Sequence, residues 1–153
     1  MTADPDSLAA WSTLVAVYQA VLHDVVRALG EQAGVDSGVF SALAYLERAD
    51  TPHRMPMSEL QSLLHPRYSQ PGFSRLVQRM EADGLVERQA DPADRRAAVL
   101  STTRLGRRAY TRANAVYGAA VNEQFGRHLT ASEGARVTRT LQRVAQRRAA
   151  LTT

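Results

Sequence analysis

The sequence predicts a mainly α protein with one small β-hairpin, and three observations predict it. Apolar residues recur at spacings of three and four along most of the 153 residues. Residues that cap helices, such as Ser, Thr and Asp, stand before several of these stretches. Between residues 85 and 101 the pattern changes from helical to extended, around a turn-forming segment. We therefore expect four helices before the hairpin and two after it.

The composition is that of one folded domain. Hydrophobic residues make up 44% of the chain and charged residues 22%, which is typical of a soluble globular protein and not of a disordered one. No apolar run approaches the roughly 20 residues that span a bilayer. Residues 1–7 contain two aspartates and no basic residue, which is unlike a secretory signal. A cytoplasmic location without membrane contact follows by default.

The residue types also restrict the chemistry. The sequence has no cysteine, which excludes a disulfide scaffold, a thiolate metal cluster and a thiol redox switch. The four histidines are scattered without metal-ligand spacing, so we expect no metal and no cofactor. The formal charge is +4, and all 19 basic residues are arginine. Arginine binds phosphate and guanine through a planar fork, although a GC-rich coding bias explains the same skew equally well.

The first two helices precede a proline-containing loop. Ser7 is expected to cap the first helix, and Gly30 and Gly34 to end it. A second helix begins near residues 36–37, and residues 50–56 form a loop that holds a very short strand. The apolar residues expected on one face of the first helix are Trp11, Leu14, Val15, Tyr18, Val21, Leu22, Val25, Val26 and Leu29.

Two short helices follow, joined by a tight turn. Ser58 and Gln61 fit a capping box at the start of the third helix. The turn is residues 65–68, where a proline cannot continue the helix. Ser69 caps the fourth helix and Gly84 ends it. The residues expected to face inward from the fourth helix are Phe73, Leu76, Val77 and Met80.

The hairpin and two long helices complete the chain. Residues 85–89 and 97–101 read as extended strands on either side of the charged turn 91–96. Thr103 caps a long fifth helix, and Thr130 with Glu133 forms a capping box for the last one. The apolar faces of these long helices have to be buried against something, and a second copy of the chain is the expected partner.

Two short helices followed at once by a charged hairpin outline a winged helix-turn-helix. A helix fits the major groove of DNA, and a cationic hairpin tip can contact the backbone or the minor groove. On an isolated helix the same polar residues would indicate only a solvated face, and it is the basic hairpin that favours DNA. The candidate DNA contacts on the fourth helix and the turn before it are Arg67, Ser69, Gln70, Gly72, Ser74, Arg75, Gln78 and Arg79.

Residues 69–110 resemble the core of the MarR family of bacterial transcriptional regulators. The matching pieces are Arg75-Leu76-Val77, Arg79-Met80-Glu81, Gly84-Leu85-Val86 with Arg88, Asp91-Pro92-Ala93-Asp94-Arg95-Arg96, and Thr103 with Gly106-Arg107. The resemblance extends over nearly the whole chain, since the flanking helical arms agree in length and order. One departure is Thr102-Thr103, which replaces a usual Leu-Thr, and we expect it to loosen the packing after the hairpin.

The resemblance implies one MarR-like domain, residues 1–153, and a homodimer. Residues 7–30 and 104–151 would form dimerisation helices, and residues 36–101 a DNA-binding lobe for half of a pseudo-palindromic operator. On the wing, Arg95 would reach the minor groove beside Arg96, and Asp94 would orient the arginine.

Family members often bind a small aromatic or anionic effector in a cleft between the dimer arms and the DNA-binding lobe. An aromatic residue at helical spacing usually belongs to a core, so each candidate here has a plain structural alternative. The aromatic residues that the resemblance places near such a cleft are Trp11, Tyr18, Phe40, Tyr45, Tyr110 and Tyr117.

Two other functions compete with a double-stranded DNA-binding repressor. An enzyme is not indicated, because the sequence shows no nucleophile with its base, no glycine-rich phosphate loop and no paired carboxylates in a plausible cleft. A winged helix used for protein contacts instead of DNA remains open. The second alternative predicts partner binding that depends little on salt, whereas DNA binding weakens steeply as salt rises.

Overall fold

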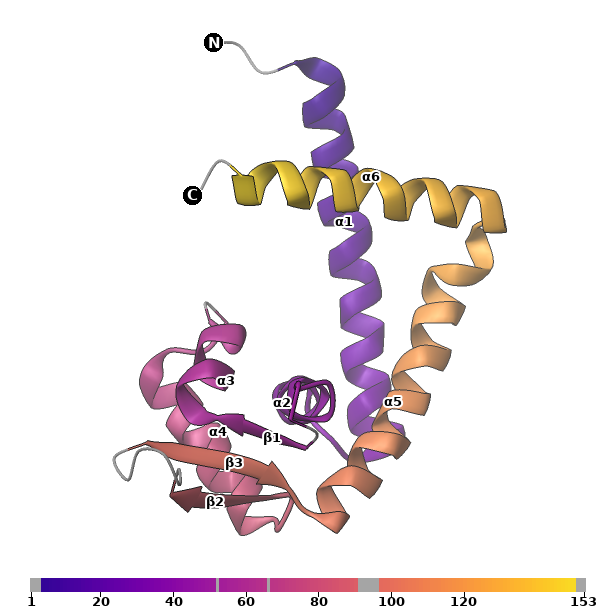
Figure 1. The fold of residues 1–153 in the computed structure, drawn as a ribbon. Coiled ribbons are helices and arrows are strands. Elements are labelled where there is room, and N and C mark those ends of the chain that lie inside the picture. The colour runs from indigo at the N-terminus through magenta and orange to yellow at the C-terminus, as the bar shows by residue number, and fades with distance from the viewer. Residues whose placement is uncertain (1–3, 52, 66, 91–96, 151–153) are drawn as a thin grey trace. The chain divides into compact units, whose positions relative to one another are not determined.

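The computed structural model describes residues 4–51, 53–65, 67–90 and 97–150. The chain divides into two compact units, residues 26–117, here called the lobe, and residues 1–25 with 118–153, here called the arm unit. Helices α1 and α5 each run from one unit into the other. The mainly α winged helix-turn-helix that the sequence predicts is confirmed (Figure 1).

Helix α1 (Pro5–Ala28) begins earlier than predicted. The carboxylate of Asp4 accepts hydrogen bonds from the backbone N–H of Ser7 at 3.0 Å and from its hydroxyl at 2.8 Å. Asp4 therefore caps the helix in place of Ser7, and the bonds from the Ser7 hydroxyl and N–H lower the pKa of that carboxyl. Gly30 lies inside a π-helical turn, η1 (Leu29–Ala33), and the chain leaves it at Gly34, whose φ is 66°.

Helix α2 (Ser37–Glu47) begins where the sequence predicts, and the side chain of Asp36 caps it. The short strand β1 (Arg54–Pro56) then runs directly into helix α3 (Met57–Leu64). The predicted capping box at Ser58 is therefore wrong, because the helix starts one residue before it and Pro56, at the cap position, has no side chain that can accept a bond.

Helix α4 (Gln70–Ala82) has the limits and the buried face that the sequence predicts. The hydroxyl of Ser69 accepts a hydrogen bond from the N–H of Gly72 at 3.3 Å, and Gly84 leaves the helix with a φ of 66°. The N–H of Leu85 donates to the carbonyl of Met80 at 2.9 Å, which closes the C-terminal turn. The buried side chains are Phe73, Leu76, Val77 and Met80.

The predicted hairpin is present as strands β2 (Val86–Ala90) and β3 (Ala98–Thr102). They pair antiparallel from Val86 opposite Thr102 to Ala90 opposite Ala98. Strand β1 pairs with the other edge of β3, so the sheet order is β1-β3-β2 (Figure 1). The sheet and helices α2, α3 and α4 enclose the core of the lobe, whose most deeply buried side chains include Leu43, Leu46, Leu60, Met80 and Leu100.

Helix α5 (Arg104–Gln124) begins where the sequence predicts, since the hydroxyl of Thr103 accepts a hydrogen bond from the N–H of Gly106 at 3.0 Å. A short 3-10 turn, η2 (Gly126–His128), leads to helix α6 (Ala131–Ala150). The predicted capping box is confirmed here. The carboxylate of Glu133 accepts from the N–H of Thr130 at 2.8 Å and from its hydroxyl at 2.7 Å, and these bonds lower the pKa of Glu133.

The arm unit leaves many of its large apolar residues exposed. None of the residues of α6 is buried, and large apolar side chains project from both terminal helices. The exposed ones are Leu8, Trp11, Leu14, Val17 and Tyr18 on α1, and Val137, Leu141 and Val144 on α6. Residues Pro5–Ala33 contain an 18-residue stretch with a mean hydropathy of 1.2, so by length and composition alone this segment could cross a membrane. The expectation that no apolar run approaches that length is therefore wrong. The residues between the large apolar ones are mostly Ala, Ser and Thr, which are uncharged and keep the mean hydropathy of the stretch high.

The close approach of α5 to the end of α4 requires a glycine. A Cβ on Gly106 would lie 2.0 Å from the carbonyl oxygen of Leu85, whereas one on Gly118 of the same helix would meet nothing within 4 Å. We expect Gly106→Ala to lower the free energy of unfolding by about 1–3 kcal/mol. Gly118→Ala should raise it by about 0.5–1 kcal/mol, because alanine loses less entropy in a helix. Urea unfolding followed by circular dichroism measures both, and effects of the same sign would contradict the packing of Gly106.

Candidate nucleic-acid interface

One face of α4 carries polar side chains that the protein leaves free. Gln70, Ser74, Arg75 and Gln78 are exposed, on the side opposite the buried residues of the helix. Within the part of the chain that the structure describes, none of these four side chains has a hydrogen-bond or ion-pair partner. A helix with one buried apolar face and one row of unpaired donors and acceptors can contact the base edges in a groove of DNA.

Of the other predicted contacts in this region, Ser69, Gly72 and Arg79 also contribute to the structure of the lobe. Ser69 is the helix cap, and its hydroxyl faces the N–H of Gly72. A Cβ on Gly72 would lie 3.3 Å from that hydroxyl and 3.6 Å from Cδ1 of Tyr68, so the glycine lets the turn pack tightly. Arg67 is exposed in the turn before α4. Arg79 is also exposed, but its guanidinium forms an ion pair with Asp36, at the start of α2.

The wing is tied to α4 at its first strand. Nη2 of Arg88, on β2, lies 2.9 Å from Oε2 of Glu81, on the last turn of α4. This bond holds the outer strand of the hairpin against the helix. The predicted wing contacts, Asp94, Arg95 and Arg96, lie outside the described residues, and their roles stay predictions.

A polar network closes the base of the wing. Thr102 is only 5% exposed. Its hydroxyl donates to Oε1 of Glu47 at 2.8 Å, and its N–H donates to the carbonyl of His53 at 2.8 Å. Nδ1 of His53 lies 2.9 Å from Oε2 of the same glutamate, and Arg107 donates to the carbonyl of Thr102 at 3.1 Å. The expectation that Thr102 loosens this region is therefore wrong, because Glu47, from the end of α2, satisfies the hydroxyl.

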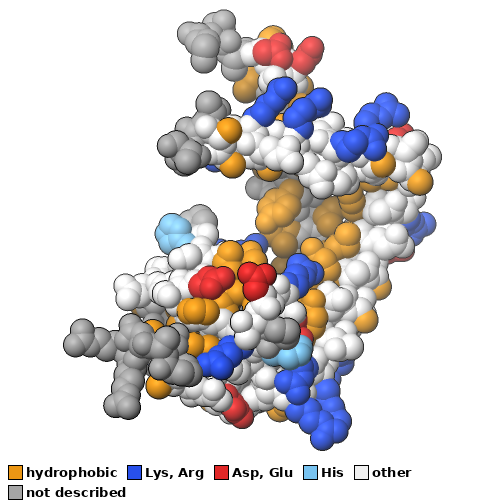
Figure 2. Space-filling view, viewed as in Figure 1, with side chains coloured by type: hydrophobic (Ala, Val, Ile, Leu, Met, Phe, Trp, Pro, Cys, Tyr) orange, Lys and Arg blue, Asp and Glu red, His pale blue; other side chains and the backbone are white. Residues whose placement is uncertain are grey.

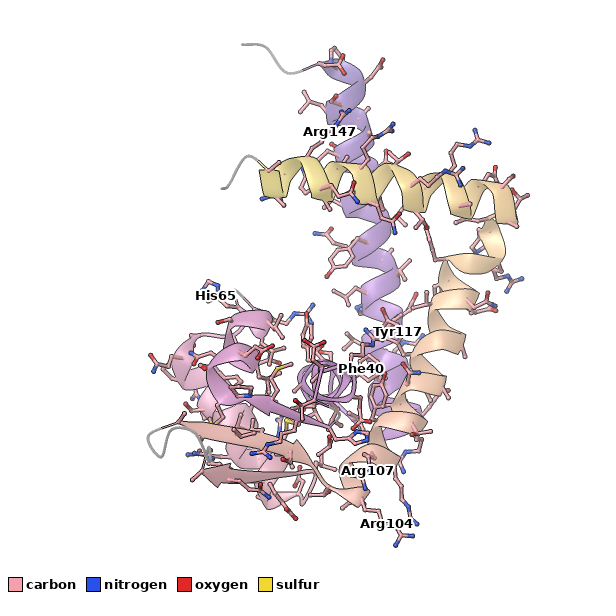
Figure 3. The ribbon with its side chains drawn as sticks, viewed as in Figure 1. Phe40, His65, Arg104, Arg107, Tyr117 and Arg147 are labelled. Carbon is pink, nitrogen blue, oxygen red and sulfur yellow. The ribbon has the colours of Figure 1, made fainter. Side chains whose placement is uncertain are left out.

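A second group of arginines lies at the start of α5, where Figure 3 labels Arg104 and Arg107. The hydroxyl of Thr103 donates to the carbonyl of Gly84 at 2.6 Å, and its N–H donates to the carbonyl of Leu85 at 3.0 Å. These bonds hold the first turn of α5 against the segment that follows α4. No carboxylate among the described residues pairs with Arg104, so this end of the lobe carries positive charge near the C-terminal end of α4.

Three of the six aromatic residues predicted near an effector cleft meet in the lobe. The ring centroids of Phe40 and Tyr117, both labelled in Figure 3, are 4.9 Å apart. Those of Phe40 and Tyr110 are 6.1 Å apart. Tyr45 also belongs to the lobe and is 37% exposed. The other two residues, Trp11 and Tyr18, lie on α1 in the arm unit and are 64% and 55% exposed.

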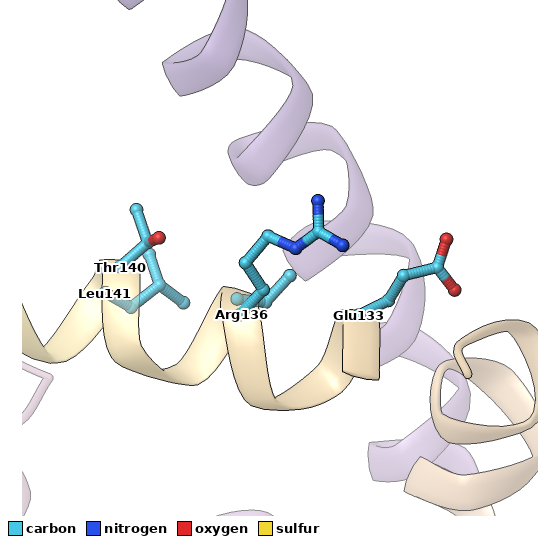
Figure 4. Close-up of a pocket in the computed structure, with 5 residues that line it drawn as sticks. Glu133, Arg136, Thr140 and Leu141 are labelled. Carbon is cyan, nitrogen blue, oxygen red and sulfur yellow. The ribbon is translucent and has the colours of Figure 1, made fainter. Parts of the chain in front are cut away.

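The arm unit has a shallow surface hollow of 270 Å³ on α6 (Figure 4). It is lined by Glu133, Arg136, Val137, Thr140 and Leu141. Arginine side chains also gather over this helix in the space-filling view (Figure 2). All five lining residues come from a single helix, so the hollow is an uncovered helix face and not an enclosed ligand site. Among the described residues, no group of three or more His, Asp or Glu side chains could hold a metal ion.

The fold and the free face of α4 together define a winged helix-turn-helix of the DNA-binding type. Residues 33–97 match the model of the MarR family, which confirms the resemblance found in the sequence and supports a regulator in place of an enzyme. No curated protein matches the chain.

Solved structures of MarR family regulators share the fold over nearly the whole chain. AbsC from Streptomyces coelicolor is 22% identical, with a TM-score of 0.80 over 96% of this chain and 97% of that one. Sco3205 from the same organism, solved in complex with DNA, is 21% identical, with a TM-score of 0.80 over 95% and 90%. A mutant MarR from E. coli, complexed with operator DNA, is 22% identical, with a TM-score of 0.70 over 93% and 99%.

The network at Thr102 gives a stability prediction. Thr102→Val removes the hydroxyl that Glu47 accepts from, and the Glu47 side chain is only 12% exposed. We expect this change to lower the free energy of unfolding by about 1–3 kcal/mol, because a shielded carboxylate loses a donor. Thr102→Ser keeps the donor and should cost about 0.8 kcal/mol for the lost methyl group. Urea unfolding compares the two, and a valine variant as stable as the wild type would show that the bond contributes nothing.

Proposed function

We propose that the protein is a sequence-specific double-stranded DNA-binding transcriptional repressor that acts as a homodimer in the cytoplasm. The observation that carries the proposal is the exposed row on α4, where Gln70, Ser74, Arg75 and Gln78 have no partner within the described chain. Its buried face fixes the helix on the lobe, so the row is presented rigidly. The DNA complexes of Sco3205 and of MarR, which share the fold, support this use of it.

Each free side chain suits a particular DNA contact. Arg75 can pair with both acceptors of guanine, and Gln70 or Gln78 can pair with adenine. Arg67, just before the helix, suits a phosphate, which positions the protein without reading sequence. On the wing we assign Arg95 and Arg96 to the minor groove and the backbone, with Asp94 orienting the arginine. These assignments divide the interface into residues that specify sequence and residues that supply general affinity.

The partner that covers the arm unit is, in our proposal, a second copy of the chain. The exposed apolar residues of α1 and α6 and the open hollow on α6 are faces that a folded protein ordinarily buries. A symmetric dimer brings two recognition helices to two half-sites, so the operator is expected to be pseudo-palindromic.

The aromatic group around Phe40 is where we expect an effector to act. Tyr117 stacks on Phe40 and remains 39% exposed, so an aromatic or anionic small molecule could stack on its outer face and bond its hydroxyl. These residues of the lobe are candidates for a site whose occupancy releases DNA, and Trp11 and Tyr18 of the arm unit are separate candidates for an effector contact.

DNA binding is tested by fluorescence anisotropy on duplexes from beside the protein's own gene, with a random duplex as control. Affinity should fall with salt with a log–log slope of about −0.9 for each phosphate neutralised. Arg75→Ala should cost roughly 1–3 kcal/mol on the preferred duplex and relax its sequence preference, whereas Arg95→Ala should weaken specific and random duplexes alike. Binding that ignores both sequence and salt would instead favour a winged helix that contacts proteins.

The dimer is tested at Trp11, which projects from α1. Trp11→Glu should convert the dimer to a monomer and abolish tight operator binding, since a charge would be buried in the apolar interface. Ser12→Glu adds the same charge at the next exposed position of α1 and serves as the control. Light scattering on a sizing column measures the mass, and far-UV circular dichroism checks folding. A Trp11→Glu protein that remains dimeric would place the interface elsewhere.

A further inference from the structure

We propose that Asp36 is a positioning residue that holds the recognition helix α4 through Arg79. In this assignment Arg79 acts inside the protein and not as a DNA contact, unlike Arg75 and Gln78 on the same helix. The inference rests on the proposed function, because its consequence is how well α4 reads a duplex.

One carboxylate serves two helices at this point. Oδ1 of Asp36 accepts hydrogen bonds from the N–H groups of Gly38 at 2.8 Å and Val39 at 3.0 Å, which caps α2. Oδ2 is thereby directed away from α2, and it pairs with Nη2 of Arg79 on α4. The cap holds the carboxylate in place, so Arg79 pairs with a group whose position is already set by α2.

Tyr68 makes a second contact between the same two helices. A Cβ on Gly38 would lie 1.9 Å from the Tyr68 hydroxyl oxygen, so the tyrosine packs directly on the first turn of α2. A Cβ on Gly72 would lie 3.6 Å from Cδ1 of the same ring, so the tyrosine also touches the first turn of α4. Gly38 stands inside a helix, where glycine is unfavourable, and this contact explains it.

The two contacts together set the direction of α4. Tyr68 precedes the first turn of the helix, and Arg79 stands in its last turn. The ten residue-to-residue steps from Ser69 to Arg79 span roughly 15 Å at the helical rise. A helix held near both ends cannot tilt without breaking one contact. Arg75, one turn before Arg79, has no partner in the described chain, so the two arginines of α4 have separate roles.

The size of the effect follows from the exposure of the pair. The side chains of Arg79 and Asp36 are 53% and 47% exposed, and an ion pair in such a setting contributes at most about 1 kcal/mol. If the ion pair contributes this free energy to holding α4 in its binding position, its loss corresponds to about a three- to fivefold change in affinity. The loss should concern sequence-specific binding, because phosphate contacts elsewhere on the lobe would remain.

The experiment compares Asp36→Ser, Arg79→Gln and the double variant by anisotropy, on the preferred and the random duplex at several salt concentrations. Serine still caps a helix, so Asp36→Ser removes the ion pair and keeps the cap. We expect each single variant to bind the preferred duplex about three- to fivefold more weakly, and the double variant to be no weaker than either. The salt slope and the affinity for the random duplex should stay at the wild-type values. Arg79→Lys, which keeps the charge, should recover part of the loss.

Asp50→Ser is the matched control, since Asp50 is exposed and has no partner among the described residues, and it should bind as the wild type does. The opposite result has a distinct signature. If Arg79 meets a phosphate, Arg79→Gln lowers the magnitude of the salt slope by about one and weakens both duplexes. Asp36→Ser then tightens binding, because it frees the arginine and removes a negative charge. That pattern, or additive losses, would overturn the inference, whereas a wild-type protein without a preferred duplex would overturn the proposed function itself.

Discussion

The burial of one face of α4 is the constraint on which the proposed interface depends. Phe73, Leu76, Val77 and Met80 are all nearly inaccessible to solvent, and the helix packs against α2, α3 and β2. Each such side chain contributes about 1.5–3 kcal/mol when fully buried, which is several times what an exposed ion pair contributes. Apolar packing therefore decides which face of α4 is presented, and the polar contacts at its ends only refine its direction.

The lobe is closed by contacts between segments far apart in the sequence. Thr103 and Gly106 bring the first turn of α5 against Gly84 and Leu85, at the end of α4. Thr102 reaches Glu47 across 55 positions of the chain. The two contacts come from the neighbouring residues Thr102 and Thr103. Thr102 bonds to the end of α2 and Thr103 to the segment after α4, so the base of the wing is held on both sides. A hairpin that is anchored in this way can carry a contact at its tip without the strands having to fold anew on DNA.

The elements of the fold could be predicted because they follow local rules. Helical periodicity located α4, and Ser69 and Gly84 marked its ends, since capping and left-handed glycine are decided within a few residues. The errors arose where two local solutions competed or where distant residues intervened. Asp4 caps α1 in place of Ser7, three residues later, and β1 leaves no room for a cap at Ser58.

The site was harder to predict than the fold. The sequence shows which residues of α4 face outward, but outward residues include both free side chains and side chains paired within the protein. Arg75 and Arg79 are alike in the sequence, and only the fold brings Asp36, 43 positions away, to one of them. In the same way, no nearby residue in the sequence explains why a glycine stands inside α2 at position 38. The structure does, because the Tyr68 hydroxyl occupies the space that a side chain there would need.

The exposed apolar faces of the arm unit have no partner among the described residues of the unit itself. Helix α6 buries none of its side chains, and α1 exposes a tryptophan and several leucines and valines. A helix of this kind gains stability only from an apolar partner, and either a membrane or a second copy would supply one. The DNA-binding lobe favours the second copy. A single helix reads only a few base pairs, and in the proposed dimer two lobes would bind two half-sites with an affinity that neither would reach alone. In the proposed function, the exposed apolar residues of the arm unit and the free face of α4 would serve the same act of operator binding.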